Sequence, residues 1–503
     1  MSHPEPVADR PATFREVLAS REYRAVFAAS ALSWLGDSMA RAAVTALVYR
    51  ETRSVLASAV TFAISYLPWL GIGPVLSALA ERYPYRRVMV TCDLVRMATM
   101  ALVAVPWMPL PAMVALLFLT SLLNPPFEAS RSALLPKLLD GDRYVVAVSM
   151  WATVAQAALI TGYFAGGALA AYDARLTVLF NAATFGISAC LVGLGVHARE
   201  PALRVDQRTH LLGETADGFK LVFGGRVLRA IAVLVFCLVL FPVVPEGIAA
   251  GWAGQLTHSL HNRGLVQGTI MMAAPVGFII GGLFVGRLVP PRTRQRLIRP
   301  FALVPPIALA LGLTAPPVYG AALISAVCGF ASAAALPAIN GLFVQALPNA
   351  FRARAFGVMS SGTNLLQAVA VFATGALADR FNSVPRVVGY WGLGGIALML
   401  GVITLWPNAD RVADAISEAQ QANAAAESGP AMPATTTGYV PRHAAAAADQ
   451  SAHPMNGTAV GGQLNGQVSP QFNGQVYRAG GPVPVNQPHQ DGPGPSPLSA
   501  ASA

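Results

Sequence analysis

The chain has 503 residues, of which 54% are hydrophobic and only 12% are charged, and its formal net charge is +10. Soluble domains carry about 25% charged residues, so this composition, with a mean hydropathy of +0.52, excludes an ordinary soluble protein. The arginines are dispersed among short polar segments without a basic block, which fits orientation in a membrane better than nucleic-acid binding. The composition therefore indicates a polytopic membrane protein.

The first part of the chain, residues 1–24, is polar and carries both signs of charge, so we expect a cytoplasmic N-terminal segment. It lacks the short apolar run and small-residue cleavage site of a removable signal peptide. We expect the first membrane span to act as an uncleaved signal instead.

About twelve apolar segments follow, each near the roughly 20 residues that a helix needs to cross a bilayer core of about 30 Å. Trp107, Pro109 and Pro111 divide one long apolar run, and Pro316 with Pro317 divides a later one. By hydropathy the expected spans lie near residues 25–49, 55–80, 88–108, 110–128, 146–171, 175–196, 230–255, 264–288, 297–315, 317–345, 355–378 and 385–406.

A polar stretch at residues 197–229 separates these spans into six and six. We therefore predict an N-terminal six-helix bundle over residues 25–196, a cytoplasmic linker over 197–229 and a C-terminal six-helix bundle over 230–407. From residue 408 to 503 the chain is rich in Ala, Gly, Pro, Asn and Gln, and its small apolar surface predicts a disordered cytoplasmic tail. Within it, residues 412–428 could form a short amphipathic helix.

The positions of lysine and arginine predict the orientation of the spans. With the N-terminus inside, the inner loops hold about three times as many of these residues as the outer loops. An even number of spans places both termini in the cytoplasm. We expect a multi-pass protein of the cell (inner or plasma) membrane.

The two predicted bundles share short sequence similarities. Leu134-Leu135-Pro136 precedes a glycine- and alanine-rich run from Gly162 to Ala170, and Ala346-Leu347-Pro348 precedes a similar run from Ala370 to Ala378. Each pair occupies the fifth span of its bundle and the loop before it. The fold class that we predict is therefore an all-α membrane protein of two pseudo-symmetric six-helix bundles around a central path.

Residues Ser77 to Arg87 read Ser-x-x-x-Glu-Arg-x-Pro-x-Arg-Arg. This resembles the loop 2–3 signature of the major facilitator superfamily, Gly-x-x-x-Asp/Glu-Arg-x-Gly-x-Arg/Lys-Arg/Lys, with Ser77 and Pro84 at the two glycine positions. The resemblance covers about residues 24–407. The first span with Asp37, the pair of Asp93 and Arg96, and the segment Pro245-Glu246-Gly247 look most like the exporter branch that includes bacterial siderophore and macrolide effluxers.

Asp37 and Arg41 lie one helical turn apart on the same face of the first span. A charge inside the hydrocarbon costs at least about 2.5–3.5 kcal/mol, so both should face the bundle interior. They could form a proton- or ligand-responsive pair that lines the cavity, or a static ion pair that fixes helix packing.

Glu246 is a second carboxylate inside a span, in the first span of the second bundle. Pro242, Pro245 and Gly247 surround it, so we expect a kinked or unwound helix there. Proton coupling needs a group whose pKa changes with water access, and a carboxyl group in a low-dielectric site meets that need. Glu246 is our first candidate for the residue that carries the proton. The alternative is that Glu246 is a water-exposed residue near the outer mouth of the cavity.

The resemblance implies that Glu81, Arg82, Arg86 and Arg87 latch the two bundles together on the cytoplasmic side when the protein opens outward. We expect Asp93 and Arg96, at the start of the third span, and Glu128 and Arg131, at the end of the fourth, to belong to this gate and conformational switch. The alternative is that the arginines only anchor the topology.

Gly162, Gly166 and Gly167 resemble the fifth-span antiporter motif Gly-Pro-x-x-Gly-Gly, and small residues let helices approach closely. Tyr163 replaces the proline, and the fourth span lacks the buried arginine of drug–proton antiporters. Other candidates along the substrate or proton pathway are polar or aromatic residues inside the spans: Tyr66, Trp69, Gln156, Asn181, Gln267, Asn340, Asn364 and Gln367.

The sequence has no phosphate-binding loop and none of the common hydrolase signatures, so we expect no enzyme and no cofactor. His258 and His261 have no third ligand nearby, and we expect no metal site. These observations predict a monomeric secondary active transporter that exports a small amphipathic organic compound, such as a drug, natural product or siderophore, with protons as a coupling ion. A nutrient or lipid-like solute importer of the same fold, or a membrane receptor or scaffold without transport, are the alternatives. The expected partners are the lipid bilayer and the small-molecule substrate, without nucleic acid.

Overall fold

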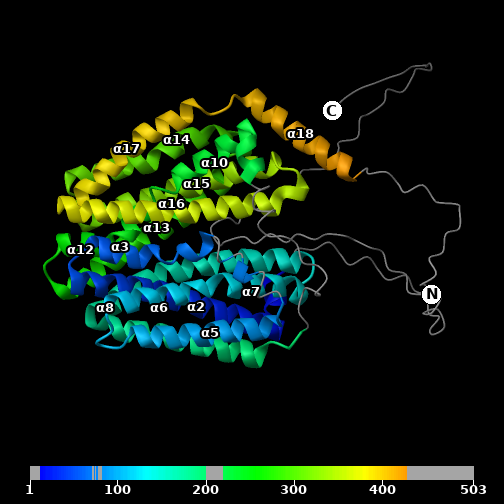
Figure 1. Ribbon diagram of the computed structural model, residues 1–503. Helices are drawn as coiled ribbons and strands as arrows, with labels where there is room; N and C mark the ends of the chain where they lie inside the picture. Colours follow the sequence, from blue (N-terminus) through cyan, green and yellow to red (C-terminus); the bar gives the residue numbers. More distant parts are fainter. Residues whose placement is uncertain (1–11, 71–72, 74, 78–81, 200–218, 428–503) are drawn as a thin grey trace, which may run out of the picture.

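The structure is a computed structural model that describes residues 12–70, 73, 75–77, 82–199 and 219–427. Within these ranges the regular structure is helical, and most helices run side by side along one direction (Figure 1). Eight helices of the described ranges are long and apolar enough to cross a membrane by length and composition. The predicted all-α membrane fold is confirmed.

The helical elements whose bounds are defined come first from the first half of the chain. They are α1 (Phe14–Val17), α2 (Arg21–Thr52), α3 (Val55–Ala63), η1 (Leu67–Leu70), α5 (Tyr85–Val103), α6 (Leu110–Leu122), α7 (Asn124–Leu138) and α8 (Asp142–Gly195). The helix α8 is long enough for two membrane crossings, and non-helical backbone angles at Asp173 divide it near the expected boundary. The break between α5 and α6 coincides with Trp107 and Pro109, as predicted.

Further helical elements with defined bounds belong to the second half. They are α10 (Arg226–Leu238), α11 (Val243–Gly247), α12 (Ala249–Leu256), α13 (Leu260–Leu288), α14 (Pro291–Ala310), η2 (Leu311–Thr314), α15 (Val318–Gln345), η3 (Asn349–Phe351), α16 (Arg352–Phe381), α17 (Val384–Thr404) and α18 (Ala409–Glu427). The expected span at 230–255 consists of three short helices, α10 to α12. The breaks lie beside Pro242 and Gly247, where the sequence predicted a kink.

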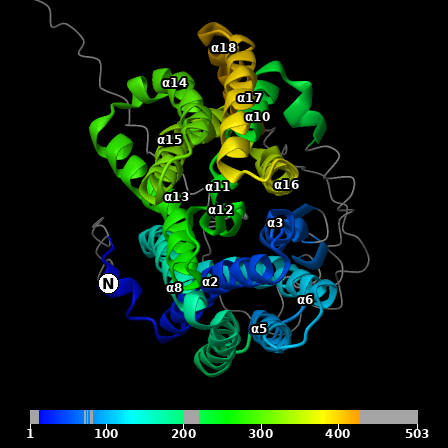
Figure 2. The ribbon, with the colours of Figure 1, turned by 90° about the vertical axis from the view of Figure 1, so that its left-hand side faces the viewer.

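Viewed along the helices, the two halves lie on opposite sides of the molecule (Figure 2). The helices α2, α3 and α8 of the first half face α11, α12, α13 and α16 of the second, and these are the helices that contact one another across the junction. Two ends can be distinguished. One end contains the end of α2, the start of α3 and the end of α16; we call it the closed end, because Asp379 of α16 bonds there to the start of α3 in the other half. The terminal end contains the start of α2 and the end of α17 (Figure 1).

The helix α18 packs on the terminal end of the second half. Ala419 is buried, and the side chain of Asn423 accepts a hydrogen bond of 2.7 Å from the backbone of Asn349. The amphipathic helix that the sequence allowed at 412–428 is present as α18, and the prediction of a disordered tail beyond it stays a prediction. Residues 428–503 lie outside the described residues, as do residues 200–218 of the predicted linker.

Candidate functional site

A polar cluster joins the two halves near the middle of the helices. Arg41 of α2 donates a hydrogen bond of 3.2 Å to the hydroxyl group of Tyr163 on α8. The same hydroxyl group is also hydrogen-bonded to the carboxyl group of Glu246 on α11. The positive charge of Arg41 attracts this carboxyl group when it is ionised. A tyrosine hydroxyl can accept one bond while it donates another, so Tyr163 connects a cation of the first half to a carboxyl group of the second.

Aromatic rings of α3 and the following turn surround this cluster. The guanidinium carbon of Arg41 lies 5.6 Å from the ring centre of Phe62, and the ring of Tyr66 lies 6.0 Å from that of Phe62 in an edge-on arrangement. Tyr163 and Phe62 are almost completely buried. These buried rings strengthen the electrostatic interactions of the half-buried Arg41 and Glu246, because they exclude part of the water that would screen the charges. Tyr66, Arg41 and Glu246, all predicted as pathway residues, thus lie together.

Asp37 belongs to a different cluster inside the first half. Its carboxylate lies 2.9 Å from the guanidinium group of Arg96, which also contacts Asp93 at 3.4 Å. Asp93 in turn accepts a bond of 2.6 Å from the hydroxyl of Ser188, and Arg96 binds the side-chain oxygen of Asn124. Among the described residues the ion-pair partner of Asp37 is therefore Arg96 and not Arg41, which differs from the expected pair.

The position of Asp93 and Arg96 also differs from the prediction. The helix α5 starts at Tyr85, so these residues lie about 12 and 16 Å along it rather than at its start. Both are almost completely buried, and the guanidinium of Arg96 lies 4.2 Å from the ring centre of Phe185. Arg96 binds both Asp93 and Asp37 within the first half, so this pair does not join the arginines at the terminal end. A buried network of this kind fixes the packing of α2, α5 and α8.

Arg131 is held by two tryptophans. Its guanidinium carbon lies 3.8 Å from the ring centre of Trp151 and 4.7 Å from that of Trp34, and it forms an ion pair with Glu128 on the same helix. The indole nitrogen of Trp151 donates a bond of 3.0 Å to the hydroxyl of Tyr23. The expected gate residues Glu128 and Arg131 therefore contact first-half residues in the structure.

The three arginines of the predicted gate lie at the terminal end. Arg82 and Arg87 are exposed and Arg86 is half-buried, whereas Glu81 lies outside the described residues. Beside them, the ammonium group of Lys137 lies 4.7 Å from the ring centre of Tyr85. The latch that the signature implies stays a prediction.

A charged cluster connects the start of α2 with the end of α8 at the terminal end. Glu22 binds Arg199 through two bonds of 2.6 and 3.0 Å and lies 2.7 Å from the imidazole of His197. The bond from Arg199 lowers the pKa of Glu22 to about 2, and the His197 contacts act in the same direction. This cluster fixes the first and last helices of the first half to each other.

The predicted polar residues fall into two groups. Gln267 of α13 crosses the junction and donates bonds of 2.8 and 2.9 Å to Ala42 and Thr45 of α2. The backbone oxygen of Trp69 accepts a bond of 3.1 Å from Ser361, also across the junction. In the second group, the side chains of Asn181, Asn364 and Gln367 are bonded within their own helices. Asn340 is buried, and the side-chain oxygen of Gln156 is buried without a partner among the described residues.

The three predicted packing glycines lie where helices meet. A side chain at Gly162 would approach within 2.9 Å of the backbone oxygen of Leu35, and one at Gly166 within 2.6 Å of the Cα atom of Met39. Gly167 instead lies across the junction, where an added Cβ atom would be 2.8 Å from the Cα atom of Gly268. The first two glycines allow α8 to contact α2, and the third allows it to contact α13.

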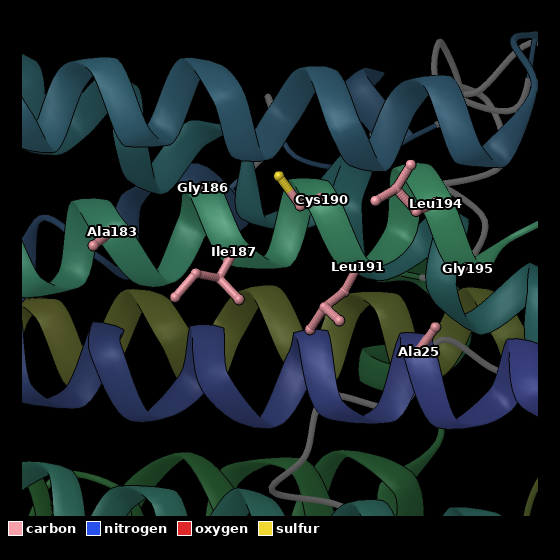
Figure 3. A pocket seen from close by; sticks show the side chains of 8 residues that line it. All are labelled: Ala25, Ala183, Gly186, Ile187, Cys190, Leu191, Leu194 and Gly195. Carbon is pink, nitrogen blue, oxygen red and sulfur yellow. The ribbon is translucent and has the colours of Figure 1, made fainter.

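A shallow groove on the side of the first half has only small and apolar side chains apart from one thiol (Figure 3). It offers no group that could bind a charged or strongly polar solute, so it is not the candidate site. Its lining residues are Ala25, Ala183, Gly186, Ile187, Cys190, Leu191, Leu194 and Gly195.

Two helical halves with buried charges at their junction define a membrane transport fold. The sequence profile of the Major Facilitator Superfamily matches residues 26–326, more than half of the chain. This chain belongs to the Major Facilitator Superfamily and is a membrane transporter.

Solved structures agree with this fold. The nucleoside transporter NupG is 12% identical, with a TM-score of 0.60 over 76% of this chain and 99% of that one. A POT family transporter in complex with 5-aminolevulinic acid is 13% identical, with a TM-score of 0.59 over 80% and 98%. A bacterial homologue of the human lysosomal transporter Spinster, inward-facing and occupied, is 10% identical, with a TM-score of 0.56 over 79% and 96%. Comparison with curated protein sequences gives no match.

Proposed function

We propose that this transporter exports a small amphipathic organic compound by alternating access, in exchange for protons. The observation that carries the proposal is the cluster of Arg41, Tyr163 and Glu246, because it joins the two halves through polar groups inside helices that the sequence predicts to cross the membrane. Ionisable residues at that depth are expensive to keep and usually mark a substrate or ion pathway. A drug, a natural product or a siderophore is the class of compound that we propose.

The charges of the cluster support this substrate class. Arg41 and an ionised Glu246 neutralise each other, and the surrounding side chains of Phe62, Tyr66 and Tyr163 are aromatic. Such a site offers stacking surface and a few polar groups, which suits an amphipathic compound better than a sugar phosphate or a nucleotide. The resemblance to siderophore and macrolide exporters points in the same direction.

Glu246 is the group that we propose to carry the proton. Its interactions with Arg41 and Tyr163 favour the ionised form, and burial favours the neutral form. When the halves separate, both influences change together, because Glu246 and its two partners belong to different halves. A bound compound that takes the place of Tyr163 or Arg41 would shift the same balance. Proton binding and substrate binding are thereby coupled.

We further propose that the terminal end faces the cytoplasm of the cell in which the protein is made. The support is the concentration of basic residues there, with Arg82, Arg86, Arg87, Lys137 and Arg199 at or beyond the ends of the helices. In this orientation the structure is closed on the outer side. The Glu81–Arg87 segment would then close the inner side in the opposite state.

The test uses inverted vesicles loaded with a pH-sensitive dye. A lipophilic fluorescent dye, a macrolide and a hydroxamate siderophore are added in turn, and compound uptake and proton efflux from the lumen are recorded together. We expect at least one compound to drive proton efflux, and Glu246→Gln to abolish it. Glu51→Gln is the matched control, since Glu51 is an exposed carboxylate that pairs with Arg175 at the closed end at 3.1 Å.

Each outcome has a distinct meaning. Undiminished proton efflux in Glu246→Gln removes Glu246 from the mechanism. Compound uptake without proton efflux keeps transport and rejects proton coupling. Uptake only in right-side-out vesicles supports an importer. Absence of uptake and of efflux for every compound favours the receptor or scaffold alternative.

A further inference from the structure

The carboxylate of Asp379, in the last turn of α16, lies on the first turn of α3 in the other half. One of its oxygens accepts a bond of 2.6 Å from the backbone nitrogen of Val55. The other accepts bonds of 2.5 Å from the hydroxyl of Ser54 and 3.2 Å from the backbone nitrogen of Leu56. A side chain of the second half therefore completes a helix terminus of the first half.

The start of α3 needs such a partner. The first backbone N–H groups of a helix have no acceptor within the helix, and they carry a partial positive charge. The hydroxyl oxygen of Ser54 accepts a bond from Ala57 at 2.9 Å, which leaves the N–H groups of Val55 and Leu56 for another acceptor. Asp379 supplies it. When the halves separate here, both N–H groups lose this partner, and so does the carboxylate.

Close packing surrounds the contact between Asp379 of α16 and the start of α3. A side chain at Gly375, one turn before Asp379, would lie 2.6 Å from the Cβ atom of Ala59 on α3. Within the second half, the side chain of Gln255 on α12 accepts a bond of 2.8 Å from the backbone of Val384 at the start of α17. The end of α16 that carries Asp379 is therefore packed closely against α3, and the turn that follows it is held by α12.

The equivalent contact between the two halves, formed by α8 and α13, is held by a different interaction. The sequence similarity of the two halves pairs Ala378 with Ala170, so the residue equivalent to Asp379 in the first half is Ala171. There, Gly264 and Gly268 of α13 lie directly against the backbone of α8 near Tyr163 and Gly167. At the closed end, α8 and α13 therefore contact each other through their backbones, whereas α16 and α3 are held together by a charged side chain.

We propose that Asp379 is the latch of the closed end: its bonds to the start of α3 hold that end shut, and their release permits opening. The proposal rests on the proposed alternating access, but it concerns the equilibrium between closed and open states rather than the substrate or the coupling ion. On opening, the three hydrogen bonds to this carboxylate are replaced by hydrogen bonds to water. The strength of the contact therefore sets the fraction of molecules in the closed state.

The experiment measures distances between spin labels at the closed end in liposomes without substrate. Labels are attached at Arg50→Cys and His258→Cys, two exposed positions at the ends of α2 and α12. The background lacks the four native cysteines, which are Cys92, Cys190, Cys237 and Cys328. The tested variant is Asp379→Ala.

The matched control is Asp173→Ala. Asp173 also accepts bonds from the first backbone nitrogens of a helical segment, at 2.8 Å from Arg175 and 3.2 Å from Leu176, but donor and acceptor belong to the same half. Loss of a capping side chain usually shifts the equilibrium by about fivefold or more. We expect Asp379→Ala to raise the ratio of long to short distances by about this factor, and Asp173→Ala to leave the ratio unchanged.

One further variant separates a latch from a general loss of structure. Asp379→Asn keeps one acceptor oxygen without the charge, so it should give an intermediate ratio with unchanged melting temperature. An unchanged distance distribution in Asp379→Ala overturns the proposal, as does an equal change in Asp173→Ala. The distances are measured without substrate. A negative result in the transport assay would therefore leave this test of the latch unaffected.

Discussion

Removal of one hydroxyl group, in the variant Tyr163→Phe, tests whether the contact between the halves matters for transport. The hydroxyl accepts a bond from Arg41 at 3.2 Å and also interacts with Glu246, while the ring is buried. Phenylalanine keeps the ring and its packing, so the change is confined to the polar connection. A hydrogen bond to a charged group contributes about 1.5–3 kcal/mol, and each 1.4 kcal/mol is about a factor of ten.

We therefore expect the initial rate of compound uptake into inverted vesicles to fall about 10- to 100-fold at equal protein content. The control is Tyr23→Phe, because the Tyr23 hydroxyl also has a buried partner, the indole nitrogen of Trp151 at 3.0 Å, but both residues lie in the first half. Its uptake rate should stay close to that of the wild-type protein. Equal rates for Tyr163→Phe and wild type would refute the reasoning that this hydroxyl links the halves during transport.

Three further predictions concern stability, measured as thermal unfolding in detergent. Arg96→Ala leaves the carboxylates of Asp93 and Asp37 buried without their cation, so we expect a loss of about 3–5 kcal/mol; the double variant Asp93→Asn/Arg96→Gln should be more stable than Arg96→Ala, and an equal or lower melting temperature would contradict this. Gly166→Val places a side chain against Met39 and should destabilise the protein strongly, whereas Gly282→Val should not, because an added Cβ atom there meets nothing within 4 Å; similar losses in both would argue against the packing explanation. Glu22→Gln should cost about 1 kcal/mol at pH 7, since the pair with Arg199 is partly exposed. The pKa of Glu22 in the folded protein is about 2, below its ordinary value, so the stability that its ionised form contributes is fully present above pH 4.5 and lost as the pH falls toward 2; a difference between wild type and Glu22→Gln that persists at the lowest pH would contradict the assignment.

The membrane spans could be predicted from the sequence because hydropathy reports the solvent directly. The break near Pro109 and the interrupted helix around Glu246 followed from residues that cannot continue a helix. The charged partners could not be predicted in the same way. Spacing along one helix paired Asp37 with Arg41, yet Arg96 from α5 binds Asp37, because contacts between helices depend on packing that the spacing does not encode.

Two residues escaped the sequence analysis for related reasons. Tyr163 was considered only as a replacement for proline in a glycine-rich motif, although a hydroxyl among glycines in a membrane span is itself a signal. Asp379 lies at the end of a span, where a charged side chain can contact water. Its presence in the sequence therefore did not indicate a function. Its partner at the start of α3 lies 324 residues away in the chain and becomes visible only when the two halves are assembled.

The central claim is that the two halves give access to their junction from one side of the membrane at a time. Gln156 tests it most directly, because it lies about two helical turns before Tyr163 on the same face of α8. Its side-chain oxygen is buried without a partner among the described residues and therefore needs water. A single cysteine at Gln156→Cys, in a background without native cysteines, is exposed to a membrane-impermeant maleimide from either side of sealed vesicles. The account predicts labelling from the terminal end in the resting protein and from the closed end after Asp379→Ala. Resistance to the reagent from both sides in both proteins would contradict it.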